Sequence, residues 1–321
     1  LIETLAESLA EGLSELRGRA IDVQRIERTP FRGSSSFATA RLRVLADGEW
    51  MDVFFKDLNP LHQLVEARGI RQTALDRSRR EHHFYPSILS GAALGTPALL
   101  GWRWAPAQGL LWLFLEDVGP KRLSRIGEFS LWVDAARWLA RLHAVSHSLP
   151  DEALDPLPKH GAQRCEDYAA KLGARLHLFP REHHRTLRYA LDLHRDLGAR
   201  LNQVPRGLVH NEYFGKNVVI RPASASERIA VIDWETASIG PAYIDLVSIS
   251  TGRWTLDQRL AMWRAYFDDA QHLAQAPPSW RVFCEDVHAV AVHHAIRWLS
   301  WWSNGDDVHI HRWLVELARV L

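Results

Sequence analysis

Two short apolar runs, each ending in polar side chains, constrain this chain most. The first lies within residues 207–220 and leads to His210, with Glu212 and Asn217 in the loop that follows, and the second leads to Asp233. If the two runs form neighbouring strands, these side chains meet where the strands end. A carboxylate can act as the base for an acceptor hydroxyl, while carboxylate and amide oxygens hold magnesium on phosphates. The pattern therefore indicates a phosphoryl-transfer centre.

Length and charge favour one large domain or two lobes and exclude several classes of partner. The 321 residues are enough to bury a substantial core. A formal net charge of +1 gives no overall attraction to nucleic acid or to an anionic membrane, and no apolar stretch is long and uncharged enough for a transmembrane helix. We therefore expect no nucleic-acid or membrane partner. Nothing in the sequence indicates the oligomeric state.

The cysteines and the start of the chain indicate the cytoplasm. Only Cys165 and Cys284 are present, far apart and without the spacing of metal ligands. Such sparse cysteine usage is typical of a reducing compartment. The chain starts at Leu1 with no initiator Met and no basic region leading into an apolar signal core, so we expect a trimmed start.

The first third of the chain is predicted to be rich in strands. Leucines at helical spacing in residues 1–17 predict an amphipathic helix that lies on the body of the protein. The expected strands cover residues 21–28, 37–45, 49–57, 97–104 and 110–115. Between the first two strands, Ser34 and Ser35 belong to a short Gly- and Ser-rich loop. That loop suits a phosphate-covering hairpin, and it suits a solvated β-turn equally well.

Lys56 stands alone at the end of the apolar run 49–57. Most lysines in such a position lie at a sheet edge and keep the ammonium group in water. A helix is predicted for residues 72–85, and Glu81 within it lies where it can pair with Lys56. An ion pair between these two side chains is therefore expected.

The remainder is predicted to be mainly helical, so the expected fold class is α+β. Helices are expected over residues 131–145, 164–178 with breaks, 182–201, and much of 240–321. We place the hinge at about residues 113–118, so that residues 1–117 form an N-terminal lobe. Residues 118–321 then form a helical C-terminal lobe that holds the loop with Glu212 and Asn217.

Several motifs occur in one order along the chain and together resemble a known family. They are Lys56, Glu81, the hinge 113–117, the segment 138–144, His210-x-Glu-x-x-x-x-Asn217, Ile232-Asp-Trp-Glu235 and Gly240-Pro-x-x-x-Asp245. In this order the chain resembles the aminoglycoside phosphotransferase and choline kinase family of protein-kinase-like small-molecule kinases. The resemblance spans about residues 20–305 and implies a bilobal fold, with a strand-rich N-terminal lobe and a helical C-terminal lobe.

The resemblance implies a nucleotide site with magnesium and with ATP or GTP as phosphoryl donor. Lys56 would grip the α- and β-phosphates, with Glu81 orienting it. Asp233 and Asn217 would hold magnesium.

The resemblance also assigns supporting and hinge residues. His210 would brace the catalytic loop, and Asp245 would tie the backbone of the loop to the helix below. Four hinge residues would offer backbone groups to adenine or guanine: Phe114, Leu115, Glu116 and Asp117.

Glu212 is the main departure from the family pattern. The family usually has His-Gly-Asp where this chain has His210-Asn211-Glu212, so the expected base is one methylene longer and a glycine is missing. Asparagine tolerates positive φ better than most residues, which allows the turn to survive. Two interpretations stay open: an active kinase, which the intact Lys56 and Asp233 favour, and a catalytically impaired nucleotide-binding pseudokinase with a regulatory or binding role.

The resemblance implies that the acceptor is a small molecule with a hydroxyl group and that it binds between the catalytic loop and the C-terminal helices, here at about residues 249–302. An antibiotic, which would make the protein a resistance enzyme, a sugar-containing or other natural product, and a choline-like amino alcohol all remain candidates. Acidic and basic residues balance in this region, so no site for a polycationic aminoglycoside stands out. The candidate acceptor residues are Glu235, Glu285, Trp298, Trp301 and Trp302. The tryptophans suit an aromatic wall, and they suit the core face of a helix as well.

Other chemistries find little support in the sequence. His143 and His147 are four residues apart on a predicted helix, which is a spacing for two zinc ligands, but no Cys or carboxylate nearby completes a site. No Gly-x-Ser-x-Gly, Gly-x-Gly-x-x-Gly or Walker-type loop is present.

Overall fold

The structure is a computed structural model that describes residues 2–31, 37–62, 74–273, 276–301 and 307–321. The chain divides into two compact units. The first unit comprises Leu1–Arg122 and Val219–Thr236, and the second comprises Leu123–Val218 and Ala237–Leu321. Among the described residues, no helix combines the length and the apolar character needed to cross a membrane.

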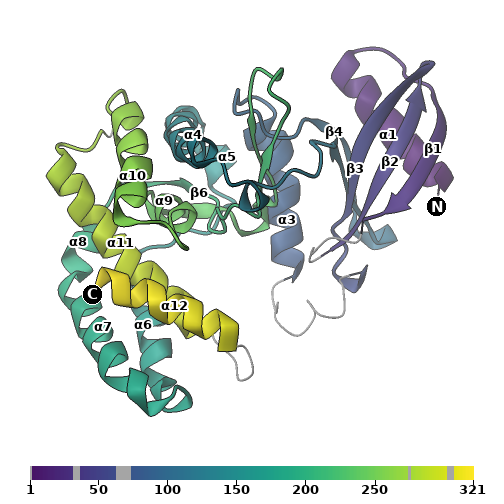
Figure 1. Ribbon diagram of the computed structural model, residues 1–321. Coiled ribbons are helices and arrows are strands. Elements are labelled where there is room, and N and C mark those ends of the chain that lie inside the picture. The colour runs from purple at the N-terminus through teal and green to yellow at the C-terminus, as the bar shows by residue number, and fades with distance from the viewer. Residues whose placement is uncertain (1, 32–36, 63–73, 274–275, 302–306) are drawn as a thin grey trace. The chain divides into compact units, whose positions relative to one another are not determined.

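The first unit is built on a five-stranded antiparallel sheet with the order β1-β2-β3-β5-β4 (Figure 1). Its strands are β1 (Val23–Pro30), β2 (Ala38–Ala46), β3 (Glu49–Asp57), β4 (Leu99–Ala105) and β5 (Leu110–Glu116), and its helices are α1 (Ile2–Arg17) and α3 (Ala74–Phe84). A single π-helical turn, Tyr85–Leu89, continues α3. The expected strands are thus confirmed, with ends that shift by a few residues.

The amphipathic N-terminal helix packs on the sheet as expected. Leu5, Leu9 and Leu13 of α1 are buried in one cluster with side chains of β2, β3 and β5 and with Ile21, which precedes β1. The contact with β4 is very close, because a Cβ built on Gly12 would lie 2.4 Å from the Cα of Gly101. A glycine in each element, Gly12 in α1 and Gly101 in β4, therefore lets the helix and the strand approach until their backbones are in contact.

A second stretch of sequence completes the first unit. The strands β7 (Val218–Ile220) and β8 (Ile229–Val231) pair with each other, and Ile220 donates its backbone N–H to the carbonyl of Lys121 at 2.8 Å. Arg221 forms a bidentate ion pair with Glu116 at the end of β5. Because of these contacts, residues 219–236 pack with the first unit. A division of the chain into residues 1–117 and 118–321 places them in the C-terminal lobe instead.

The second unit is mainly helical. Its helices are α4 (Phe129–Ser148), α5 (Asp151–Leu154), α6 (Ala162–Ala174), α7 (His184–Asp196), α8 (Gly198–Gln203), α9 (Ile244–Ile249), α10 (Leu256–Ala270), α11 (Trp280–Ser300) and α12 (Asp307–Val320). Two short strands, β6 (Arg206–Val209) and β9 (Ser238–Pro241), form an antiparallel pair. Short 3₁₀ turns occur at Pro60–His62, Pro106–Gln108, Leu123–Arg125, Leu176–Leu178, Arg181–His183 and Trp234–Thr236.

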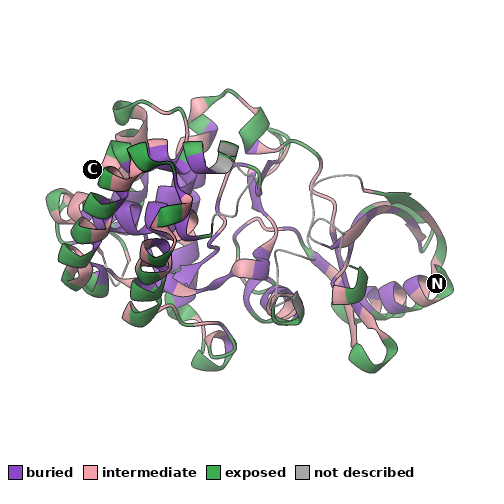
Figure 2. Ribbon diagram, turned by 90° about the horizontal axis from the view of Figure 1, so that it is seen from below, coloured by how far each residue is buried: buried purple, intermediate pink, exposed green. Residues whose placement is uncertain are grey.

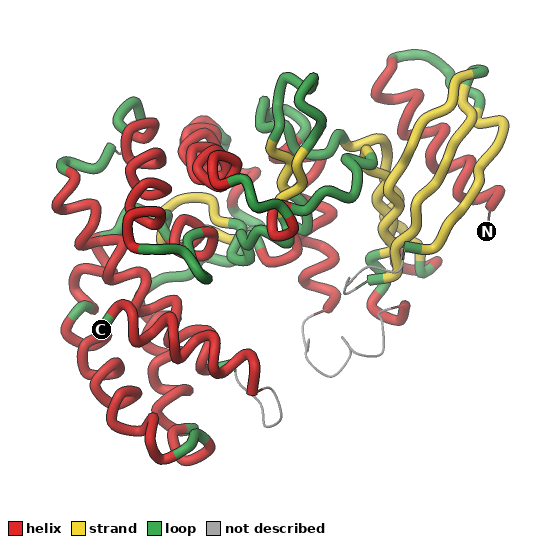
Figure 3. The backbone as a smooth tube through the Cα atoms, in the orientation of Figure 1, coloured by secondary structure: helices red, strands yellow, loops and turns green. Residues whose placement is uncertain are grey.

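Figure 3 shows strands concentrated in the first unit and helices in the second, which confirms the α+β class. The helix expected over residues 182–201 is interrupted at Leu197, where α7 ends and α8 begins. Gly198 follows directly, and glycine is a weak helix former.

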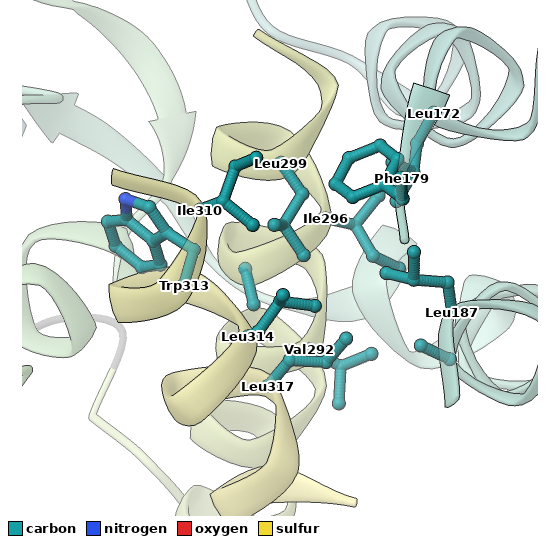
Figure 4. Packing of buried hydrophobic residues seen from close by; sticks show 12 residues of the cluster. Leu172, Phe179, Leu187, Val292, Ile296, Leu299, Ile310, Trp313, Leu314 and Leu317 are labelled. Carbon is teal, nitrogen blue, oxygen red and sulfur yellow. The ribbon is translucent and has the colours of Figure 1, made fainter. Parts of the chain in front are cut away.

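The core of the second unit lies where α11 and α12 meet α6 and α7 (Figure 4). Val292, Ile296 and Leu299 of α11 pack against Trp313 and Leu317 of α12. In Figure 2 the buried positions of this unit follow the inner faces of its helices. This core fixes α11, and with it the side chains that reach the loop after β6, which is described below.

Candidate active site

Lys56 lies at the centre of a buried ion-pair cluster in the first unit. Its Nζ is 2.6 Å from a carboxylate oxygen of Glu81 on α3 and 2.7 Å from Oδ1 of Asp233, which follows β8. Lys56 is 4% exposed and Glu81 is 1% exposed. The pair expected from the sequence is therefore formed, and Asp233 joins it from a segment far away in the chain.

Charge and burial compete in this cluster. Burial acts to lower the pKa of Lys56, but the carboxylates of Asp233 and Glu81 outweigh it and raise the pKa above its usual range. Burial raises the pKa of Glu81, against the attraction of Lys56. Lys56 is therefore a permanent cation, held at the end of a strand and available to an anionic ligand.

Backbone conformation turns the Asp233 side chain outward from its buried surroundings. Asp233 has φ +71°, a left-handed conformation that is rare for residues other than glycine, and its side chain is 31% exposed. The next residue, Trp234, is fully buried and stacks on Phe84 of α3 with ring centroids 4.6 Å apart. The stacked ring anchors the turn and leaves the preceding carboxylate partly exposed.

Carboxylate oxygens gather beside Lys56. Glu81, Asp233 and Glu235 each bring one oxygen to within 4.8 Å of the others. Glu235 is 1% exposed and lies 3.4 Å from Nη1 of Arg77. Hard oxygen ligands of this kind are those that magnesium prefers, so Asp233 and Glu235 fit a magnesium ion.

The loop after β6 is tied down through its backbone in the second unit. Asp245, at the start of α9, is fully buried and accepts the N–H groups of His210 at 2.5 Å and Asn211 at 2.9 Å. Asn211 adopts φ +67°, so asparagine maintains the left-handed turn where the family usually has glycine. Burial raises the pKa of Asp245, and the hydrogen bonds from the two backbone N–H groups oppose that rise.

Glu212 and Asn217 are connected within this loop. The side-chain Nδ2 of Asn217 donates to the backbone carbonyl of Glu212 at 2.9 Å. The N–H of Glu212 donates to Nδ1 of the buried His210 at 3.3 Å. The carboxylate of Glu212 is 15% exposed and lies 3.2 Å from Nζ of Lys216. His210 is thus hydrogen-bonded to the backbone of the loop, and the Glu212 side chain is partly exposed to solvent.

The expected hinge residues at the end of β5 divide into core and surface groups. Phe114 is fully buried in the sheet core, and Leu115 is paired with Leu99 of β4. The N–H of Glu116 donates to the carbonyl of Ala98, and that of Asp117 to Asp52. The carboxylate of Asp117 binds Arg41 at 2.7 Å. Ser34 and Ser35, expected to cover phosphates, lie outside the described residues.

The candidate acceptor residues lie in different surroundings. Trp298 stacks on Trp313 at 5.4 Å, while Trp301 is 51% exposed with Nζ of Lys171 over its ring at 3.7 Å. Glu285 binds Arg200 of α8 at 2.7 Å. Trp302 lies outside the described residues. Glu235 belongs to the carboxylate cluster of the first unit.

A cavity that the sequence did not indicate lies between α9, α10, α11 and α12. Its volume is about 280 Å³, and its walls include Trp254, Trp263, Trp313, Arg259, Glu316 and Arg319. The cavity adjoins the loop after β6 through aromatic side chains. The ring centroids of Trp313 and Phe214 are 6.4 Å apart, and those of Trp254 and Trp132 are 4.9 Å apart. The ring of Trp132 in turn lies against Gly215, where an added Cβ would be 2.6 Å from it. Because the wall residues come from four separate helices, no local pattern in the sequence indicates the cavity.

The histidine pair considered for zinc has other partners. His143 is buried and hydrogen-bonds through Nδ1 to the hydroxyl of Tyr266 at 2.8 Å, and His147 donates Nδ1–H to the carbonyl of His143 at 2.6 Å. The described residues bring no third zinc ligand to these rings. Burial lowers the pKa of His143 to about 4, so this ring is neutral and structural.

The sequence profile of the phosphotransferase enzyme family matches residues 27–283. The chain belongs to this family. The match covers every motif from Lys56 to Asp245, and it confirms the family that the sequence resembles. No curated protein is similar enough in sequence to count as a match.

Solved structures support the same fold. Choline kinase from Cryptosporidium parvum aligns with a TM-score of 0.62 at 10% identity, over 100% of this chain and 94% of its own. The GDP complex of aminoglycoside 2'-phosphotransferase-IIIa gives 0.59 at 14% identity, over 97% and 96%. Macrolide 2'-phosphotransferase from Brachybacterium faecium gives 0.56 at 15% identity, over 98% of both chains. The fold is therefore the protein-kinase-like fold of small-molecule kinases.

Proposed function

We propose that this protein transfers the γ-phosphoryl group of ATP or GTP to a hydroxyl group of a small molecule. The observation that carries the proposal is the buried Lys56, held at 2.6–2.7 Å by Glu81 and Asp233. A cation so oriented can bind phosphate oxygens with little loss of side-chain entropy. The family match supports the same reaction class.

Magnesium is the expected metal, with Asp233 and Asn217 as its ligands by the family resemblance. When bound, it neutralises charge on the phosphates. Glu235 offers a further carboxylate beside Asp233. The GDP complex of a similar fold makes a guanine nucleotide as reasonable a donor as ATP. Two free cysteines suit the reducing cytoplasm in which such nucleotides are abundant.

Glu212 is proposed as the base that accepts the proton of the acceptor hydroxyl. Its carboxylate is partly exposed, and its backbone is held on both sides by His210 and Asn217. The two hydrogen bonds that hold its backbone support an active enzyme.

The cavity of the second unit is proposed as the acceptor site, and its walls favour an uncharged ring compound. A volume of about 280 Å³ is at the lower end for small-molecule sites and suits one or two rings. Three tryptophans line it. Glu316 is the only carboxylate among the described wall residues, and it already accepts from Arg259, Arg319 and the N–H of Gly252. Two arginines would repel a polycationic aminoglycoside or choline.

The test is a phosphorylation screen with purified protein, magnesium and ATP or GTP. The library contains neutral hydroxylated one- and two-ring compounds, aminoglycosides, macrolides and choline. We expect turnover of a neutral ring compound, loss of turnover in Asp233→Asn, and normal turnover in Asp192→Asn, whose side chain is 62% exposed on α7. Full turnover in Asp233→Asn would refute the proposed role of Asp233.

The role of Glu212 needs a variant of its own. Glu212→Gln should reduce kcat by about 10²- to 10⁴-fold, the usual contribution of a positioned base. Unchanged kcat in this variant would exclude an essential base at this position. Thermal stabilisation of the wild type by nucleotide, with no turnover on any acceptor, would instead favour a nucleotide-binding pseudokinase, because a ligand stabilises the native state without chemistry.

The acceptor site is tested by filling the cavity. Ala291 lines it on α11 and is 7% exposed, so Ala291→Phe should raise KM for the acceptor at least tenfold and leave KM for the nucleotide unchanged. Equal KM values for the acceptor in both proteins would place the acceptor elsewhere.

A further inference from the structure

The side chain of Asn211 is built into the interior of the second unit. Asn211 is 1% exposed, and both ends of its amide are hydrogen-bonded. Its Nδ2 donates to Oγ of Ser238 at 2.6 Å, and its Oδ1 accepts from Nη1 of Arg297 at 2.9 Å. A glycine at this position could make neither bond, so these contacts belong to this chain's departure from the family pattern.

The two partners come from different elements and hold the loop from two sides. Ser238 begins β9, where it pairs with Val209, the last residue of β6 before the catalytic loop. Arg297 lies near the end of α11, which the core of the second unit fixes in place. Asn211 therefore links the strand pair that delivers the loop to a helix 86 residues away in sequence.

Arg297 is itself restrained. Its guanidinium carbon lies 5.9 Å from the ring centroid of Tyr168 and 5.9 Å from that of Trp298. Its charge also favours the ionised form of the buried Asp245, which binds the N–H groups of His210 and Asn211. The same arginine thus supports the loop twice, through a hydrogen bond to the Asn211 side chain and through the charge of Asp245.

We propose that Arg297, acting through Asn211, is a positioning residue for Glu212. The proposal rests on the role of Glu212 as the base. A glutamate is one methylene longer than the usual aspartate, so its carboxylate reaches the same place only if the backbone beneath it is held in a fixed position. The Asn211 side chain supplies that restraint, and the two departures, asparagine and glutamate, work as a pair. A misplacement of about 1 Å is enough to lower a rate about a hundredfold.

The test uses variants of Arg297 with a matched control on the same helix. Arg297→Met removes the donor and the charge but keeps an unbranched apolar stem, and Arg297→Lys keeps the charge. Arg281→Met is the control, because the Arg281 side chain is 84% exposed and its ion pair among the described residues is with the nearby Glu285 at 3.6 Å. With any acceptor found in the screen, Arg297→Met should lower kcat 10- to 100-fold at unchanged KM for the nucleotide. Arg297→Lys should recover part of the loss, and Arg281→Met should match the wild type.

A second readout does not depend on activity. Hydrogen exchange of the peptide that contains His210 and Asn211 reports their N–H bonds to Asp245. Exchange there should be at least tenfold faster in Arg297→Met and in Asn211→Gly. The effect in the double variant should be smaller than the product of the two single effects, because both changes remove the bond between Arg297 and Asn211. Wild-type exchange and wild-type kcat in Arg297→Met would overturn the proposal. If the wild type phosphorylates nothing, the proposed function fails, while faster exchange in Arg297→Met would still establish the link between Arg297 and the loop.

Discussion

Removal of Lys56 should destabilise the protein through the carboxylate that it leaves behind. In Lys56→Met the Glu81 carboxylate, 1% exposed, keeps no cation at 2.6 Å. Breaking a buried ion pair by removing one partner costs about 3–5 kcal/mol. Asp233 adds little to this cost because its side chain is 31% exposed and can be hydrated. We therefore expect a loss of about 3–5 kcal/mol in the free energy of unfolding near neutral pH.

The loss should depend on pH in a defined direction. Burial raises the pKa of Glu81, and removal of Lys56 raises it further because the attraction of Lys56 acts to lower it. A carboxyl with a raised folded-state pKa binds more protons when folded, so its contribution is largest below its unfolded pKa and is lost as pH rises through the folded pKa. The deficit of Lys56→Met should therefore be smaller at pH 5 than at pH 8.

Urea unfolding at both pH values measures this deficit, with Lys56→Met/Glu81→Gln as the companion variant. The double variant has no buried carboxylate at residue 81, so we expect it to recover about 2 kcal/mol or more at pH 8 and to show a flatter pH dependence. An equal deficit at both pH values, with no recovery in the double variant, would refute the account of Lys56 as the counter-charge of Glu81.

Three further predictions concern close contacts and the loop. Gly12→Ala should lower the free energy of unfolding by about 1–3 kcal/mol through overpacking against Gly101. Helix propensity alone predicts a gain in stability of about 1 kcal/mol. A higher urea midpoint than that of the wild type would therefore contradict the close contact. Gly215→Ala places a methyl group 2.6 Å from Trp132 and should shift the loop, which faster hydrogen exchange of its peptide would report. Asp245→Asn turns an NH₂ group toward one backbone N–H and should lower the free energy of unfolding, measured with urea, by about 1–3 kcal/mol. An unchanged free energy of unfolding would contradict the assigned hydrogen bonds.

Much of the fold follows from local patterns in the sequence. Leu5, Leu9 and Leu13 recur at helical spacing, and the structure buries all three on one face. The pairing of Lys56 with Glu81 follows from a strand end and the next helix along the chain. Such features are predictable because hydrophobic periodicity and turn chemistry depend on residues that are only a few positions apart in the sequence.

Features that join distant segments were not predictable. The bond between Asn211 and Arg297 spans 86 residues, and no periodicity links the two positions. Asn211 was expected to tolerate a left-handed turn, as it does, but the burial of its side chain depends on where α11 lies. Trp298 has the same appearance in sequence whether it lines a ligand site or packs on Trp313, and only the tertiary structure distinguishes these.

The discontinuity of the first unit has a consequence for how the protein is made. Its ion-pair cluster needs Asp233, which leaves the ribosome 177 residues after Lys56. At roughly 5–20 residues per second, the synthesis of Asp233 follows that of Lys56 by about 9–35 s. During that interval the sheet lacks β7 and β8, which belong to the same unit. A gene fragment that stops at residue 122 would thus encode a sheet without Asp233. The first unit can be transferred intact only together with the residues of the second unit that lie between its two stretches of sequence.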